Sequence, residues 1–216
     1  MAKNSKWQDE YWLLLMQLYL QKPTGIKPMY SKAMVDLSLE LHIAPQQLFN
    51  KMCQIANLET PRIEHIWDVY GQNPRKLKRA VNLLREMWGF NNALEFYEGV
   101  ETIESFEKEF KPIADDTTLT PMMLVLILDE YFRLTPITMV PETPEVQALA
   151  KMMRLKPQEV VDVMEAFQHC DPYLNRKDEM KGNLVLACQQ VWRRFGNSEP
   201  QELASYAEQL RDYFEH

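Results

Sequence analysis

The sequence predicts an all-α protein. Apolar residues recur at helical spacing along most of the chain, whereas the strict alternation of apolar and polar residues that marks half-buried strands is hard to find. With 46% hydrophobic and 25% charged residues, the 216-residue chain has an ordinary globular composition. Glycine is rare, at 6 residues, and methionine is plentiful, at 13. We therefore expect helices joined by turns rather than sheets or disordered segments.

A shift of about 112 residues aligns the chain with itself. The aligned positions are core residue types and turn residues: Leu37, Leu41, Pro45, Leu48 and Met52 fall on Leu149, Met153, Pro157, Val160 and Met164. After a small deletion, the later matches are Leu77, Ala80, Leu84 and Trp88 with Leu184, Ala187, Val191 and Phe195, then Phe106 and Phe110 with Leu210 and Phe214. The pattern predicts a tandem duplication of a roughly five-helix unit.

The predicted boundaries follow from this alignment. Residues 1–110 form copy one and residues 120–216 form copy two. The polar segment 111–119, KPIADDTTL, has one proline and no periodicity, which indicates a linker. An alternative is one compact body, with Met122–Phe132, apolar almost all round, buried against copy one.

Helix starts can be assigned in order along the chain. Ser5 with Gln8 resembles a capping box for a helix that ends near Leu20, and Thr120 before Pro121 begins its counterpart, which ends near Leu134. Further N-cap and proline pairs predict the later helices: Thr60 with Pro61, Asn73 with Pro74, and Thr143 with Pro144. Gly89 and Gly196 are expected to end helices.

Each copy is expected to contain a helix-turn-helix-like pair, and the segment from Pro144 to Pro172 is the clearer example. Pro157 suits the first position of its second helix, because the missing N–H costs nothing there. The residues expected to be buried are Leu149, Ala150, Met153, Leu155, Val160 and Val163.

The sequence lacks the motifs of common enzyme classes. GxSxG, GxxxxGK[ST], GxGxxG and HExxH do not occur, and six glycines leave little for a phosphate-cradling loop. His169, Cys170 and Asp171 are adjacent, so on a helix they point about 100° apart and cannot converge on one metal ion. We therefore predict a protein without catalytic residues, metal or cofactor.

Location is inferred from cysteines and apolar runs. The three cysteines, Cys53, Cys170 and Cys188, lack CxxC spacing, and no signal-peptide pattern precedes Trp7, so a reducing cytoplasm fits best. No apolar run approaches the roughly 20 residues that a membrane span needs. We expect a cytoplasmic protein that does not enter the membrane.

Copy one carries the candidate binding residues. A helix starting at Pro45 would bury Leu48 and Met52 and direct its polar face to solvent: Gln46, Gln47, Asn50, Lys51 and Gln54. Amide side chains can pair with adenine edges and lysine can contact phosphate, as on a DNA recognition helix. The helix from Pro74 adds a basic cluster: Arg75, Lys76, Lys78, Arg79 and Arg85. The alternative interpretation is a solvated polar surface without a ligand.

Copy two does not share this chemistry. Its equivalent outward positions are Gln158, Glu159, Asp162, Glu165 and Gln168, and carboxylates repel phosphate. The imbalance extends to the halves of the chain, because residues 1–89 carry a net charge of +4 and residues 90–216 carry −11. Copy two is therefore expected to be a structural or protein-interaction module, or to compete with nucleic acid for copy one.

Both copies resemble a known helical module. PEVQALAKMMRLKPQEVVDVMEAFQHCDP in copy two and LHIAPQQLFNKMCQIANLETP in copy one are similar to the module found ahead of the nuclease domain in some bacterial HNH endonuclease-like proteins. The family's small turn glycine is replaced by His42 and Arg154, and nothing resembling the HNH core follows either copy. The resemblance implies a DNA-associated accessory module without nuclease activity.

Two functions follow as expectations. The first is a non-enzymatic helical protein that binds duplex DNA or another nucleic acid through copy one. The second is a protein–protein interaction adaptor with two unlike faces, in which the acidic copy two docks a protein.

Overall fold

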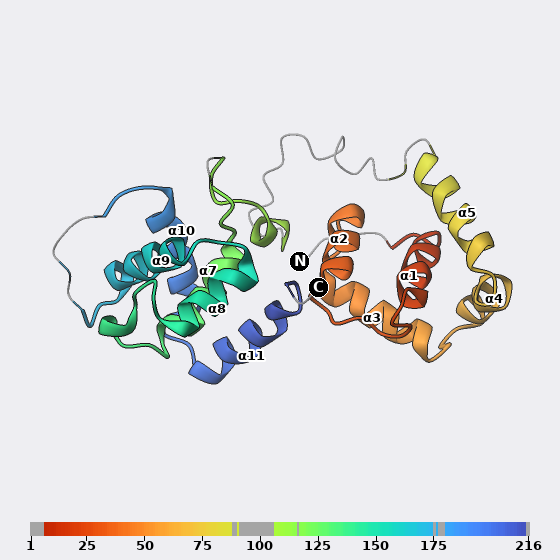
Figure 1. The fold of residues 1–216 in the computed structure, drawn as a ribbon. Coiled ribbons are helices and arrows are strands. Elements are labelled where there is room, and N and C mark those ends of the chain that lie inside the picture. The colour runs from red at the N-terminus through yellow and green to blue at the C-terminus, as the bar shows by residue number, and fades with distance from the viewer. Residues whose placement is uncertain are drawn as a thin grey trace. The chain divides into compact units, whose positions relative to one another are not determined.

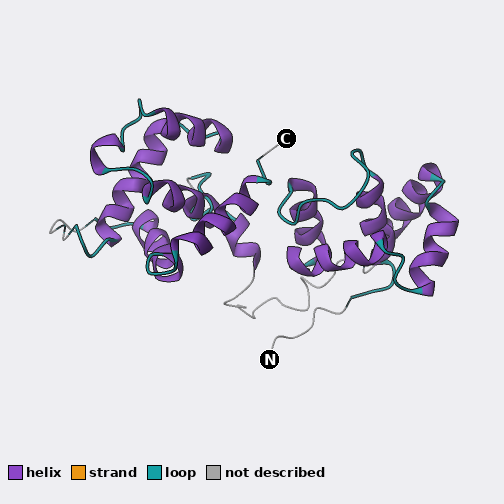
Figure 2. Ribbon diagram, turned by 90° about the horizontal axis from the view of Figure 1, so that it is seen from below, coloured by secondary structure: helices purple, strands orange, loops and turns teal. Residues whose placement is uncertain are grey.

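The computed structural model describes residues 7–87, 90, 106–115, 117–174, 176 and 180–214. These residues form ten α-helices and two 3₁₀ helices and contain no strand, which confirms the all-α class (Figure 2). The chain divides into two compact units, unit 1 (Met1–Ile103) and unit 2 (Glu104–His216). None of the helices in the described residues combines the length and apolar character that crossing a membrane requires.

Unit 1 is built around its first helix. The helices are α1 (Tyr11–Leu20), α2 (Lys32–Leu41), α3 (Pro45–Ala56), α4 (Pro61–Tyr70) and α5 (Pro74–Glu86), labelled in Figure 1. Helix α1 packs against α3, α4 and α5, and α2 packs against α3. The core side chains at the centre of this packing include Leu15, Met34, Leu48, Met52 and Val81.

Unit 2 consists of one central apolar helix and the elements that surround it. They are η1 (Phe106–Phe110), α7 (Pro121–Tyr131), η2 (Pro136–Thr138), α8 (Pro144–Met153), α9 (Pro157–Cys170), α10 (Asn183–Phe195) and α11 (Pro200–Arg211). Helix α7 packs against η1, α8, α9, α10 and α11 (Figure 1). The neighbours within unit 2 thus account for a helix that is apolar almost all round.

Most predicted helix starts are found where the N-cap and proline pairs place them. The side-chain oxygens of Thr60, Asn73 and Thr120 accept from the backbone N–H three residues later, at 3.3, 3.3 and 3.4 Å. Helix α8 also begins at Pro144, but Thr143 does not cap it, since its hydroxyl donates to the carbonyl of Thr138 at 2.5 Å. Other predicted signals, Ser5, Trp88 and Gly89, lie outside the described residues.

The pairs α2–α3 and α8–α9 coincide when shifted by 112 residues. Their starts match, and so do the ends of α2 and α8, whereas α9 continues to Cys170, past Gln168 where the shift places the end of α3. His42 and Arg154 follow α2 and α8 in the left-handed conformation, with φ of 55° and 59°. The N–H of Ile43 donates to Ser38 at 3.1 Å, and that of Leu155 donates to Ala150 at 2.9 Å. The expected helix-turn-helix-like geometry is therefore present in both units. Their origin in a duplication stays a prediction.

The segment Phe106–Phe110 lies in unit 2, although the repeat alignment placed it at the end of copy one. Glu109 pairs with Arg194 at 2.8 Å and accepts from the hydroxyl of Tyr206 at 2.7 Å. The ring centroid of Phe110 is 5.8 Å from that of Tyr213. The observed division falls after Ile103 rather than in the expected linker 111–119, because the partners of η1 are on α10, α11 and the segment after α11.

Candidate nucleic-acid interface

The outer face of α3 presents amides to solvent. Gln46, Gln47 and Asn50 are exposed, and the amide of Gln46 donates to Asn50 at 3.2 Å. The opposite face is buried through Leu48, Met52 and Ile55, so helical periodicity fixes which residues point outward. Gln54 is only half-buried rather than fully exposed. Three of the five predicted α3 residues thus form an uncharged hydrogen-bonding surface.

Lys51 points toward aromatic rings. Its ammonium lies 5.2 Å from the ring centroid of Trp7 and 5.1 Å from that of Trp12. The residue precedes buried Met52 on the flank of the apolar stripe, and its long stem carries the charge onto the two rings. Lys51 was expected to contact phosphate, but in this position its charge is already engaged by cation–π contacts.

The first turns of α5 hold exposed cations. Arg75, Lys78 and Arg79 are exposed, and none of them makes a hydrogen bond, ion pair or ring contact within the described part of the chain. Leu77, Val81 and Leu84 are buried on the opposite face. Arg75 and Arg79 are four residues apart, so they share the outward face of the helix, with Lys78 beside them.

Several other cations of unit 1 contact groups of the protein itself. Lys76 lies 5.2 Å from the ring centroid of Tyr70. Arg85 donates to both carboxylate oxygens of Glu40 at 2.6 and 2.8 Å, and this hydrogen bonding raises the pKa of the guanidinium. Lys27 is buried, which lowers its pKa, and it donates to the carbonyls of Gln21 and Pro23.

The predicted residues therefore fall into two surfaces. Helices α3 and α5 both pack against α1, and neither packs closely against the other. One surface is the amide face of α3, and the other is the set Arg75, Lys78 and Arg79, which we call the α5 basic face. The sequence alone missed the aromatic partners Trp7 and Tyr70. For Trp7, the aromatic residues that cluster near the start of the chain were a signal that could have indicated a partner for a lysine side chain.

The corresponding face of α9 in unit 2 is partly neutralised within the protein. The amide of Gln158 donates to Asp162 at 2.8 Å, and Glu165 pairs with Arg176 at 3.6 Å. Gln168, expected to be exposed, is buried: its amide donates to the sulfur of Met139 at 3.3 Å, and its oxygen accepts from Arg176. The expectation was wrong because Met139, which precedes α8, and Arg176, which follows α9, both contact this side chain.

Cys188 is buried, and Cys53 and Cys170 are half-buried. The Sγ of Cys170 donates to the carbonyl of Ala166 at 3.3 Å, and burial raises the pKa of its thiol to about 11. Within the described ranges, no group of His, Cys, Asp and Glu side chains is arranged to hold a metal ion.

Comparison of the chain with protein-family models, with curated proteins and with solved structures finds no match.

Proposed function

We propose that unit 1 is a non-enzymatic nucleic-acid-binding module. The observation that carries the proposal is the α5 basic face, three exposed cations gathered on the first turns of one helix with no carboxylate partner among the described residues. Such a surface attracts the phosphate backbone, because each cation that meets a phosphate releases a condensed counterion. The resemblance to DNA-associated helical modules agrees with this assignment.

The three cations have different parts in the proposed contact. Arg75 and Arg79 share one face and can each offer two parallel N–H donors to a phosphate, whereas Lys78 supplies a point charge at the flank. Helix α5 also begins at this end, and its dipole adds partial positive charge near Arg75. These features favour a polyanion over an acidic peptide with widely spaced charges.

The amide face of α3 is assigned a different role. Gln46, Gln47 and Asn50 carry no charge, so they contribute little to phosphate attraction. Amides can instead pair with base edges in the major groove, where Asn and Gln recognise adenine. Lys51 is left out of this contact, since its ammonium lies over two indole rings.

The test is the salt dependence of binding to a fluorescent 20-base-pair duplex, followed by anisotropy with the full chain from about 50 to 200 mM KCl. Replacing Arg75, Lys78 and Arg79 together by Gln leaves three phosphates without a cation. The slope of log K against log salt should become shallower by about 2.7, at about 0.9 for each phosphate that is no longer neutralised. The pair of substitutions Arg75→Lys and Arg79→Lys preserves charge and should preserve the slope.

Two further variants distinguish phosphate attraction from recognition of the base sequence. Arg193→Gln removes an exposed cation from α10 of unit 2 and should leave the slope unchanged. Replacing Gln46, Gln47 and Asn50 by Ala should keep the slope and reduce the preference for one duplex sequence over another. The proposal fails if the chain does not bind duplex or single-stranded nucleic acid at the lowest salt, or if the triple Gln variant keeps the original slope.

A further inference from the structure

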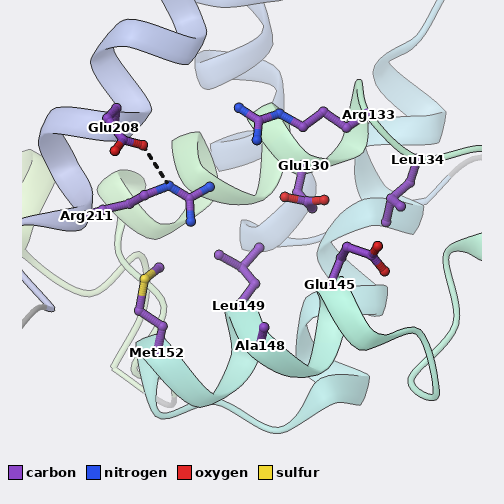
Figure 3. A pocket seen from close by; sticks show the side chains of 9 residues that line it. All are labelled: Glu130, Arg133, Leu134, Glu145, Ala148, Leu149, Met152, Glu208 and Arg211. Carbon is purple, nitrogen blue, oxygen red and sulfur yellow. Dashed lines mark ion pairs between the residues drawn. The ribbon is translucent and has the colours of Figure 1, made fainter.

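A cavity of about 620 Å³ lies in unit 2 beneath the end of α7 (Figure 3). Helix α7 contributes Glu130 and the turn after it contributes Arg133, while α8 contributes Glu145, Leu149 and Met152, and α11 contributes Arg211. All of these elements belong to one unit, so the cavity does not depend on how the two units are arranged. The α5 basic face belongs to the other unit, unit 1.

One of the carboxylates that line the cavity, that of Glu130, belongs to a largely buried residue. Glu130 is 8% exposed, and among the described residues its side chain makes neither a hydrogen bond nor an ion pair. In Figure 3 the carboxylate projects into the space between Arg211 and Glu145. Buried carboxylates are normally paired, because losing water without a replacement costs free energy. A carboxylate that faces a cavity and makes no hydrogen bond or ion pair within the described part of the chain can take a partner from a ligand.

The two arginines of the cavity are already engaged. The Oδ2 atom of Asp129, itself 4% exposed, lies 2.7 Å from Arg133 and 3.6 Å from Arg211. The Nε of Arg211 is a further 3.6 Å from Glu208. Two guanidinium groups thus share a site with four carboxylates, those of Asp129, Glu130, Glu145 and Glu208. The excess charge is negative, so the site disfavours an anion.

The excess of carboxylates over guanidinium groups is also reflected in the pKa of Glu130. Burial is the main cause that raises the pKa of its carboxyl group, and Asp129 and Glu145 raise it further. Arg133 and Arg211 oppose the shift without cancelling it. A cation placed beside Glu130 would stabilise the ionised carboxylate, and this attraction would offset the free-energy cost of its desolvation.

The opposite wall of the cavity is apolar. Ala148, Leu149 and Met152 follow one another along the face of α8 that lines the cavity, and Leu149 is 3% exposed (Figure 3). A methylene chain lying on this wall would bury apolar surface while its end reached Glu130. The cavity therefore combines an apolar wall with an anionic end.

We propose that this cavity binds a primary alkylammonium group, with the ammonium on Glu130 and the alkyl stem along Leu149 and Met152. A compact ammonium suits the site, because it places its charge on Glu130 without stacking a second planar cation against Arg211. The same chemistry is offered by a lysine side chain of a protein partner and by a free alkylamine. The inference does not rest on nucleic-acid binding by unit 1.

The probe is pentylamine, titrated into the full chain labelled with ¹³C at the methionine methyl groups. The methyl signal of Met152, assigned by its disappearance in Met152→Leu, reports on the cavity. Pentanol and pentanoate have the same stem with a neutral or negative end. Pentylamine should bind at least about tenfold more tightly than pentanol, or about 1.4 kcal/mol, and pentanoate should bind more weakly than either.

Two variants test the role of Glu130. Glu130→Gln keeps the size of the side chain and should remove the preference for pentylamine over pentanol, with circular dichroism to establish that the fold is kept. Glu145→Gln, on an exposed residue, should weaken pentylamine binding by a smaller factor. Glu202→Gln removes an exposed carboxylate of α11 that does not line the cavity and should leave the affinity unchanged.

A last comparison identifies the source of the ammonium. Tighter binding of the peptide acetyl-Gly-Lys-Gly-amide than of 1,5-diaminopentane would support a lysine of a protein partner, and the reverse order would support a free amine. Equal binding of pentylamine and pentanol, stronger binding of pentanoate, or full pentylamine affinity in a folded Glu130→Gln protein would each overturn the proposal.

Discussion

The turn after α8 offers a sharp test of the physical reasoning, because Arg154 holds a conformation that glycine adopts more easily. Arg154 is exposed and has φ of 59°. The left-handed conformation costs an L-residue roughly 1–2 kcal/mol, while glycine adds about 0.5–1 kcal/mol of unfolded-chain entropy that folding must overcome. The difference predicts that Arg154→Gly stabilises unit 2 by about 0.5–1 kcal/mol.

A matched control lies three residues earlier. Lys151 is exposed in the last turn of α8, where glycine costs about 1 kcal/mol relative to a good helix former. Lys151→Gly should therefore destabilise unit 2, so the same new residue has opposite effects at two neighbouring positions. His42→Gly in unit 1 should stabilise less than Arg154→Gly, since the half-buried imidazole of His42 packs against its surroundings and glycine cannot replace that packing.

The assay is urea unfolding of the full chain followed by circular dichroism, with free energies compared at equal m-values. If the two units unfold in separate transitions, Arg154→Gly should shift the urea midpoint of one transition, and His42→Gly should leave that midpoint unchanged. A destabilisation by Arg154→Gly as large as that by Lys151→Gly would refute the argument, because it would mean that the turn is held by contacts of the arginine side chain.

Three further predictions concern unit 2. Gly196→Ala would place a Cβ 2.6 Å from the indole of Trp192, which is buried and cannot easily move, so urea unfolding should show a destabilisation of about 1–3 kcal/mol. Burial raises the pKa of Glu130, so the folded state binds this proton more tightly than the unfolded chain does. The free energy of unfolding therefore falls as the pH rises from the ordinary Glu pKa of about 4.3 through the higher pKa of the folded state. Thermal unfolding should therefore find Glu130→Gln more stable than the wild type at pH 7 and nearly equal to it at pH 3.5; a constant difference at both values would contradict this. Burial also raises the pKa of the Cys188 thiol, so mass spectrometry should show slow alkylation at pH 8 in the native protein and fast alkylation in urea, and equal rates would count against it.

The candidate site was only partly predictable from the sequence. The amides Gln46, Gln47 and Asn50 are exposed as the apolar spacing of α3 requires, since burial of one helical face settles the direction of the other. Lys51 could not be placed in this way, because its long side chain can reach either solvent or a neighbouring helix. Glu130 left a signal that was overlooked: it is one of two adjacent acidic residues in an otherwise apolar helix.

The sequence by itself determined the features that depend on local chemistry. The all-α class, the helix starts at Thr60, Asn73 and Thr120, and the turn shared by α2–α3 and α8–α9 follow from caps, prolines and apolar spacing within a few residues.

Tertiary structure decided the features that join distant parts of the chain. It placed η1 in unit 2, paired Arg85 with Glu40, and left Glu130 in a cavity between three helices. These partners are separated by tens of residues, and their contacts depend on how helices pack rather than on the residues beside them. The local pattern therefore specifies each helix, and packing specifies which charges remain free to bind a ligand.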